Sequence, residues 1–137
     1  MTESNQLNNI EVVMREMLEI QQKSKMFVNL LSEGDSLSQN QLILLIQLKI
    51  MGEMKATEIA DTFSVTPGAV TSMCDKLEKL NLIQRVRDNE DRRVVKMTLT
   101  NSGELKVQEI FLKFSPDKLT DIAKTLMNVN QLMNKIF

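Results

Sequence analysis

Residues 55–83 read KATEIADTFSVTPGAVTSMCDKLEKLNLI, and this stretch predicts two helices joined by a tight turn at Ser64 and Val65. Apolar residues recur at helical spacing on both sides of the turn: Ile59, Ala60 and Phe63 before it, then Val70, Met73, Cys74 and Leu77 after it. Thr66 followed by Pro67 is a typical helix start, because threonine caps free backbone N–H groups and proline suits the first helical position. Asn81 tolerates the left-handed conformation that often ends a helix, so the second helix is expected to end there.

The small, apolar and β-branched residues of this stretch match a helix-turn-helix. Ala60 is small enough for the point where two helices cross, Val65 is an apolar turn residue, and Val70 is a β-branched residue inside the second helix. Any amphipathic helix pair can supply some of these features, so a purely structural helical hairpin is the alternative.

Residues 85–100, RVRDNEDRRVVKMTLT, follow almost at once and predict a charged β-hairpin. Val95, Met97 and Leu99 alternate with polar residues, as in a strand with one buried face, and an acidic tip lies between the arginines. A solvated surface hairpin is the simplest interpretation of such a charge run. A basic hairpin directly after a helix-turn-helix is instead typical of a winged helix, in which wing arginines lie beside the DNA backbone or enter the minor groove.

The motifs together resemble the multiple-antibiotic-resistance regulator (MarR) family of bacterial transcription factors. The similarity covers residues 38–104, and it includes the wing pattern Asp-x-x-Asp-Arg-Arg at Asp88–Arg93 and the Leu99-Thr100 pair followed by Gly103. The resemblance implies a homodimer whose terminal helices interlock, a second motif helix in the major groove, and a wing arginine in the minor groove. By the same resemblance that arginine is Arg93, braced by Asp91.

The residues expected to contact DNA lie on the second motif helix and on the wing. On the helix they are the positions left facing outward when Val70, Cys74 and Leu77 face the core: Thr66, Gly68, Ala69, Thr71, Ser72 and Lys76. On the wing they are Arg85, Arg87, Arg92 and Arg93. Asp91 is expected to fix the direction of Arg93 before DNA arrives, so that less side-chain entropy is lost on binding. Ser72 stands where many relatives have arginine, so base readout by this helix is expected to be modest.

Both ends of the chain carry apolar stripes at helical spacing. The predicted dimerisation residues are Leu7, Ile10 and Met17 at one end, and Leu119, Ile122, Leu126, Val129, Met133 and Ile136 at the other. Such stripes are more often the core of the same chain, but a single small winged module offers little surface to cover both. The predicted organisation is therefore one subunit, residues 1–137, with dimerisation helices over 1–37 and 101–137 and a winged helix-turn-helix over 38–100. The fold class is mainly α with a small β-hairpin.

Composition excludes several classes of protein. The 137-residue chain has a formal net charge of −1 and contains no histidine, tyrosine or tryptophan, which removes the commonest general base and zinc ligand. No nucleophile, base and orienting group can be assembled, so we expect no enzyme, no cofactor and no metal. The single cysteine, Cys74, is expected to be a buried thiol rather than a redox sensor. Neither a signal peptide nor a membrane span is recognisable, which predicts a cytoplasmic protein.

The favoured function is a sequence-specific regulator of transcription that binds double-stranded DNA. It is expected to be a homodimeric repressor of a pseudo-palindromic operator, with release by a small-molecule effector as a further expectation. The alternative is a winged-helix module that binds another protein and binds DNA no better than any weakly basic surface.

Overall fold

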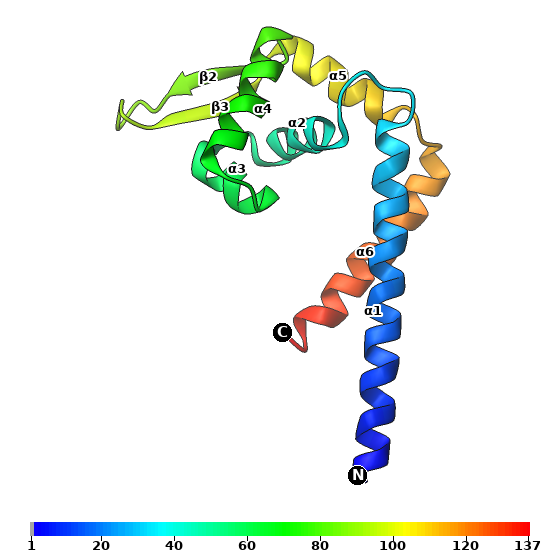
Figure 1. The fold of residues 1–137 in the computed structure, drawn as a ribbon. Helices are drawn as coiled ribbons and strands as arrows, with labels where there is room; N and C mark the ends of the chain where they lie inside the picture. The colour runs from blue at the N-terminus through cyan, green and yellow to red at the C-terminus, as the bar shows by residue number, and fades with distance from the viewer. Residues whose placement is uncertain (1) are drawn as a thin grey trace.

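A long helix projects from a winged helix-turn-helix module in the computed structural model, which describes residues 2–137 (Figure 1). The elements in chain order are α1 (Glu3–Ser32), α2 (Gln39–Met51), β1 (Glu53–Lys55), α3 (Ala56–Phe63), α4 (Pro67–Lys79), β2 (Ile83–Arg87), β3 (Val95–Leu99), α5 (Asn101–Phe111) and α6 (Pro116–Asn134). The mainly helical fold with a small β wing that the sequence predicts is therefore confirmed.

The helix-turn-helix forms where the local signals place it. Ser64, with φ 53°, takes the left-handed conformation between α3 and α4. The Thr66 side chain accepts a hydrogen bond from the Ala69 backbone N–H at 3.2 Å, and Pro67 opens α4. Asn81, with φ 61°, turns the chain from the end of α4 toward β2. Caps and turn residues therefore set both ends of α4, as the sequence predicts.

The wing is a three-stranded antiparallel sheet in the order β1-β3-β2. β2 and β3 form the predicted hairpin, with Ile83 opposite Leu99 and Arg87 opposite Val95. β1 is a strand that the sequence pattern does not reveal, because three residues are too few to show alternation. It pairs with β3, and its central residue Met54 is buried opposite Met97. This third strand joins the wing to the end of α2.

The core of the module is apolar and includes residues from α2 to α5. Its fully buried large side chains are Leu42, Leu44, Leu45, Leu48, Ile59, Val70, Cys74, Leu77, Ile83, Val107 and Ile110. Two of them, Val107 and Ile110, belong to α5, so the first part of the predicted C-terminal dimerisation segment packs on the module. α6 has no fully buried residue, but three of its predicted dimerisation residues, Leu119, Ile122 and Val129, are half-buried against their own chain.

A buried carboxylate fixes the junction between α1 and the module. Asp35, in the loop after α1, has a side chain only 3% exposed and forms an ion pair with Lys106 of α5 at 2.8 Å. It also accepts a hydrogen bond from the Leu37 backbone N–H at 2.9 Å, and Lys113 lies 3.6 Å away. Burial raises the pKa of Asp35, but the Lys106 and Leu37 hydrogen bonds and the two lysine charges outweigh burial, and the pKa is lowered.

Candidate nucleic-acid interface

The exposed face of α4 carries the residues that the sequence assigns to DNA. All six of them are exposed, whereas Val70, Cys74 and Leu77 on the opposite face are buried. The structure therefore confirms the predicted rotation of this helix. The Thr71 hydroxyl donates to the Pro67 carbonyl at 3.1 Å, which leaves its methyl group and its oxygen lone pair for a ligand. The face is otherwise made of small side chains and one lysine, Lys76.

The start of α2 lies beside α4 and was not predicted to take part in the site. Ser38, Asn40 and Gln41 line a hollow of about 280 Å³ together with α4 residues that include Ser72 and Lys76. The Gln41 side chain accepts a hydrogen bond from the Ser38 backbone N–H and completes a capping box. The side-chain amide of Asn40, in contrast, makes none of the hydrogen bonds described for residues 2–137. A serine three residues before a glutamine signals a helix start in the sequence, but only the tertiary structure brings it next to α4.

Arg93 and Asp91 form the two-pronged contact that the sequence predicts. Arg93 Nε lies 3.1 Å from Asp91 Oδ1, and Arg93 Nη2 lies 3.3 Å from Asp91 Oδ2. The Arg93 backbone N–H also donates to Asp91 Oδ1 at 3.1 Å. These hydrogen bonds from Arg93 lower the pKa of Asp91. The Arg93 side chain is nevertheless 92% exposed, so its guanidinium is oriented while it remains accessible to a ligand.

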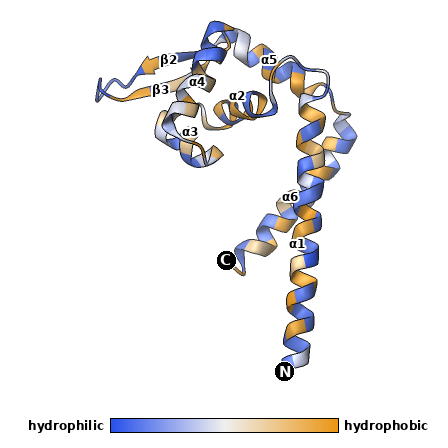
Figure 2. Ribbon diagram, viewed as in Figure 1, coloured by the Kyte–Doolittle hydropathy of each residue, from blue (hydrophilic) through white to orange (hydrophobic). Residues whose placement is uncertain are grey.

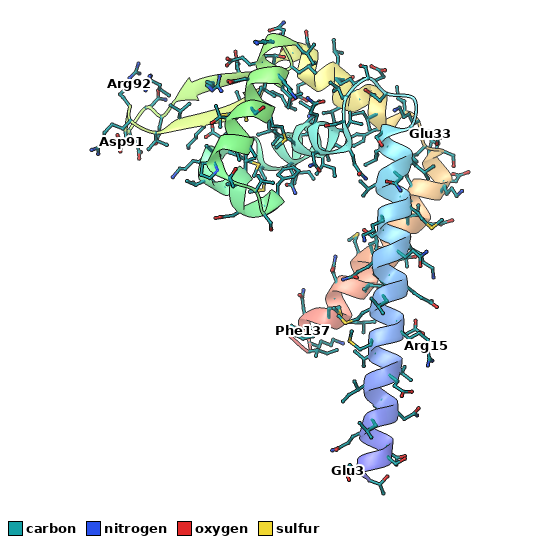
Figure 3. The ribbon with its side chains drawn as sticks, viewed as in Figure 1. Glu3, Arg15, Glu33, Asp91, Arg92 and Phe137 are labelled. Atoms are coloured by element: carbon teal, nitrogen blue, oxygen red, sulfur yellow. The ribbon has the colours of Figure 1, made fainter. Side chains whose placement is uncertain are left out.

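The tip of the wing is held by backbone contacts and by a second arginine. Arg87 Nη1 donates to the Arg92 carbonyl at 2.8 Å, which ties the end of β2 to the tip. The Asp88 N–H donates to the Val94 carbonyl at 3.0 Å and closes the loop. Arg92 and Asp91 lie at the outer end of the hairpin, away from the rest of the module (Figure 3). Arg92 is exposed at this tip and is therefore open to a large ligand.

Arg85 occupies a different environment from the other wing arginines. Its Nη2 lies 2.7 Å from Asp75 Oδ1 and its Nη1 lies 2.6 Å from Glu78 Oε1. Both acids belong to α4, and the hydrogen bond to Asp75 is the main reason that the pKa of Arg85 is raised. To contact a phosphate, Arg85 would have to leave these ion pairs. Its assignment to DNA stays a prediction, and the acids that engage it were not predicted.

Comparison with known proteins decides the family. The MarR family model matches residues 37–95, which run from the start of α2 through the wing tip. The helix-turn-helix and the wing of this chain are therefore those of the MarR family. Over 78 residues it is 42% identical to the HTH-type transcriptional repressor MdtR of Bacillus subtilis, a match that covers 57% of this chain and 50% of that protein. The chain thus spans about half the length of this curated MarR-family relative.

Solved structures show the same fold over nearly the whole chain. The regulator BldR from Sulfolobus solfataricus is 25% identical, with a TM-score of 0.63, and the match covers 98% of this chain and 99% of that one. A mutant of E. coli MarR complexed with operator DNA is 21% identical, with a TM-score of 0.67, and the match covers 95% of this chain and 96% of that one. The MarR-like fold therefore includes the terminal helices as well as the module.

The matching family and the relative MdtR are both described as regulators of transcription, which is the class of protein that the sequence favours. The described residues contain no group of three or more acidic, histidine or cysteine side chains placed to hold a metal ion. Cys74 is buried, as predicted, and burial raises the pKa of its thiol, which disfavours the reactive thiolate. Between residues 2 and 137, no helix has both the length and the apolar character to cross a bilayer.

Proposed function

We propose that this chain regulates transcription by binding double-stranded DNA, with α4 in the major groove and the wing in the adjacent minor groove. The observation that carries the proposal is the Arg93–Asp91 pair: an arginine that is almost fully exposed and yet held in one direction. A solvated surface arginine has no need of such a brace. A minor groove selects a directed guanidinium, because its narrow width strengthens the negative potential.

The binding unit is proposed to be a homodimer formed by the terminal helices. α1 leaves the module and extends well beyond it, with Glu3 at its far end (Figure 3). Every residue of α1 from Glu3 to Met26 is exposed, including Leu7, Ile10 and Met17, and orange apolar bands run along the helix (Figure 2). α6 likewise exposes Leu126, Met133 and Ile136. A second copy of the chain is the occupant that fits, because a twofold dimer buries matching stripes and presents two α4 helices to a pseudo-palindrome.

Repression of a promoter is the proposed consequence of binding. It is supported by the relative MdtR, which is named a transcriptional repressor. Release by a small effector stays a prediction. The hollows described on a single chain are 210 to 330 Å³, and the largest is lined mainly by polar residues around Asn81 and Asn101. The two more apolar hollows, of about 280 and 210 Å³, are smaller than the roughly 300 Å³ or more of typical ligand pockets, so a dimer would have to complete an effector site.

A fluorescence anisotropy titration tests the proposal against the protein-interaction alternative. The full chain is titrated with genomic duplex fragments at several salt concentrations, alongside a random duplex of equal length. We expect one class of fragment to bind at least about 10³-fold more tightly than random duplex. Equal, weak affinity for every fragment would favour the interaction module.

The Asp91→Ala variant tests the brace itself. If Asp91 only adds negative charge to the interface, its removal should tighten the complex. If it orients Arg93, its removal should weaken binding by about two- to tenfold, the effect of ordering one long side chain at binding. The Glu90→Gln variant is the matched control, since it removes a neighbouring acid that makes no ion pair within the described residues. A tighter complex for Asp91→Ala would refute the brace and leave the winged-helix assignment intact.

A further inference from the structure

Arg85 joins the wing to the helix proposed to read DNA. We infer that it is a positioning residue, which holds strand β2 against α4 through Asp75 and Glu78, and that its charge serves these acids rather than DNA phosphates. We call this three-residue group the Arg85 clamp. The inference rests on the proposed function, since the relative position of wing and α4 matters for binding only if both contact one duplex.

The geometry of the Arg85 clamp is that of a rigid link. Two different nitrogens of one guanidinium contact two different carboxylates, at 2.7 Å and 2.6 Å. Asp75 and Glu78 are three residues apart on α4, so they lie on one face of that helix. The Arg85 side chain is 33% exposed, far less than the 92% of Arg93 on the same hairpin. A planar guanidinium with two anchors restricts both distance and orientation, which a single lysine contact does not.

Apolar packing does not provide this link by itself. A hollow of about 210 Å³ lies between α4 and the wing, lined by Thr71 and Cys74 on one side and by Val95 and Met97 on the other. Along β2, only Ile83 is buried, and the four residues that follow are exposed. Beyond Ile83 the strand is therefore held by its ladder to β3 and by Arg85. β3 buries Met97 and Leu99, so it is the outer strand β2 that can twist relative to the helix unless a polar contact fixes it.

Electrostatics gives the Arg85 clamp a second role. Asp75 and Glu78 lie on either side of Lys76, which is one of the α4 residues proposed to contact DNA. Two unpaired carboxylates at this place would repel phosphates and offset the lysine. Arg85 pairs with both of them and cancels one of their two charges, so the acids oppose Lys76 and repel phosphates less than they would without Arg85. The acids on a DNA-facing helix are thereby explained as anchors for the wing.

Salt-dependent binding separates positioning from phosphate contact. We would measure the affinity of the full chain for duplex DNA at several salt concentrations for the wild type and for Arg85→Met, Arg85→Lys and the double variant Asp75→Asn/Glu78→Gln. Arg92→Met is the matched control for loss of one wing charge. A lost phosphate contact lowers the slope of log affinity against log salt by about 0.9. Circular dichroism checks that each variant is folded.

Positioning predicts that Arg85→Met binds about three- to tenfold more weakly with the wild-type salt slope, whereas Arg92→Met shows the flatter slope. Arg85→Lys should be nearly as impaired as Arg85→Met, because lysine cannot bridge both acids. The double acid variant should also bind more weakly, although it removes two negative charges. Three results would overturn the inference. They are a flattened salt slope for Arg85→Met, wild-type affinity for Arg85→Lys, and tighter DNA binding by the double acid variant.

Amide hydrogen exchange keeps this test independent of DNA binding. If the wild type binds no duplex, the proposed function fails, and exchange then decides the Arg85 clamp alone. Backbone amides of β2 and of the last turn of α4 should exchange faster in Arg85→Met than in Arg92→Met. Equal exchange in the two variants would show that Arg85 does not hold the wing.

Discussion

Gly103→Ala probes a close approach between two backbone segments, the tightest found at a glycine of the described residues. Gly103 lies in the first turn of α5, and a Cβ added there would lie 2.0 Å from the Leu82 carbonyl oxygen and 3.1 Å from Leu99 Cδ2. Ordinary van der Waals contact begins at 3.4 Å. The backbones of α5 and of residue 82 must therefore separate by about 1.4 Å, the difference between 2.0 Å and 3.4 Å. Neither is the end of a flexible side chain, so the strain cannot be relieved by a rotamer change.

The separation would also break the hydrogen bonds that join α5 to the base of the wing. The Thr100 backbone N–H donates to the Leu82 carbonyl at 3.1 Å, and the Thr100 hydroxyl donates to the Asn81 carbonyl at 2.6 Å. The same hydroxyl accepts from the Gly103 N–H at 3.0 Å and caps α5. Overpacking costs about 1–3 kcal/mol and a lost cap about 0.5–2 kcal/mol, so we expect Gly103→Ala to lower the unfolding free energy by about 2–4 kcal/mol.

Urea unfolding at one fixed protein concentration measures this loss, since the stability of a dimer depends on concentration. Gly68→Ala is the matched control, because a Cβ at Gly68 meets only the Thr66 hydroxyl oxygen at 3.9 Å. We expect the control to stay within about 1 kcal/mol of wild type, on the stabilising side, as alanine suits a helix better than glycine. A Gly103→Ala protein within about 0.5 kcal/mol of wild type would refute the close approach.

Three further predictions address α4, the dimer and the α1 junction. Thr71→Ala should weaken DNA binding with little change in stability, whereas Leu77→Ala should lower the unfolding free energy by about 2–5 kcal/mol in urea unfolding. Equal losses of unfolding free energy in the two variants would mean that the rotation assigned to α4 is wrong. Leu126→Asp should place an unpaired charge in the proposed dimer interface, so sedimentation velocity should show dissociation of the dimer and DNA binding should be lost. An intact dimer of this variant would contradict the proposed interface. Asp35→Asn should destabilise the protein at neutral pH, because it removes the carboxylate charge that pairs with Lys106 at 2.8 Å and leaves only the longer contact of Lys106 with Glu109 at 3.8 Å. The lowered pKa of Asp35 means that its contribution to stability is present above the unfolded carboxyl pKa of about 3.9 and is lost as the pH falls through the lower folded value. The urea midpoints of variant and wild type should therefore converge as the pH falls through that folded value, and a constant difference would argue against the ion pair.

The parts of the site that the sequence predicts correctly depend on neighbours along the chain. Thr66 and Pro67 start α4 and Asn81 ends the turn after it because caps and left-handed residues act within a few positions. The rotation of α4 follows from the period of its apolar residues. The Arg93–Asp91 contact joins residues two apart, so an ion pair at the tip follows from the local sequence, and the family resemblance singled out Arg93 as its arginine.

The tertiary structure decided the contacts between segments distant in sequence. β1 is too short to show a pattern and exists because Met54 pairs with Met97 of β3. The charge run at 85–93 does not distinguish Arg85 from Arg93, and only the packing of α4 against β2 brings Asp75 and Glu78 to Arg85. The same holds for Gly103, whose need for glycine comes from the carbonyl of residue 82 and not from its own helix.

For the terminal helices, the sequence establishes an apolar face, and only the three-dimensional structure shows what covers it. The spacing of Leu7, Ile10 and Met17 establishes that one face of a helix is apolar, because 3.6 residues make a turn. Periodicity does not say what covers that face, since a stripe against the same chain and a stripe against another chain have the same period. The arrangement of α1 and α6 in space shows what a single chain covers: the α1 stripe stays exposed, and the α6 stripe is half-buried at Leu119, Ile122 and Val129 but exposed at Leu126, Met133 and Ile136. The exposed apolar area is what makes a second copy the proposed partner.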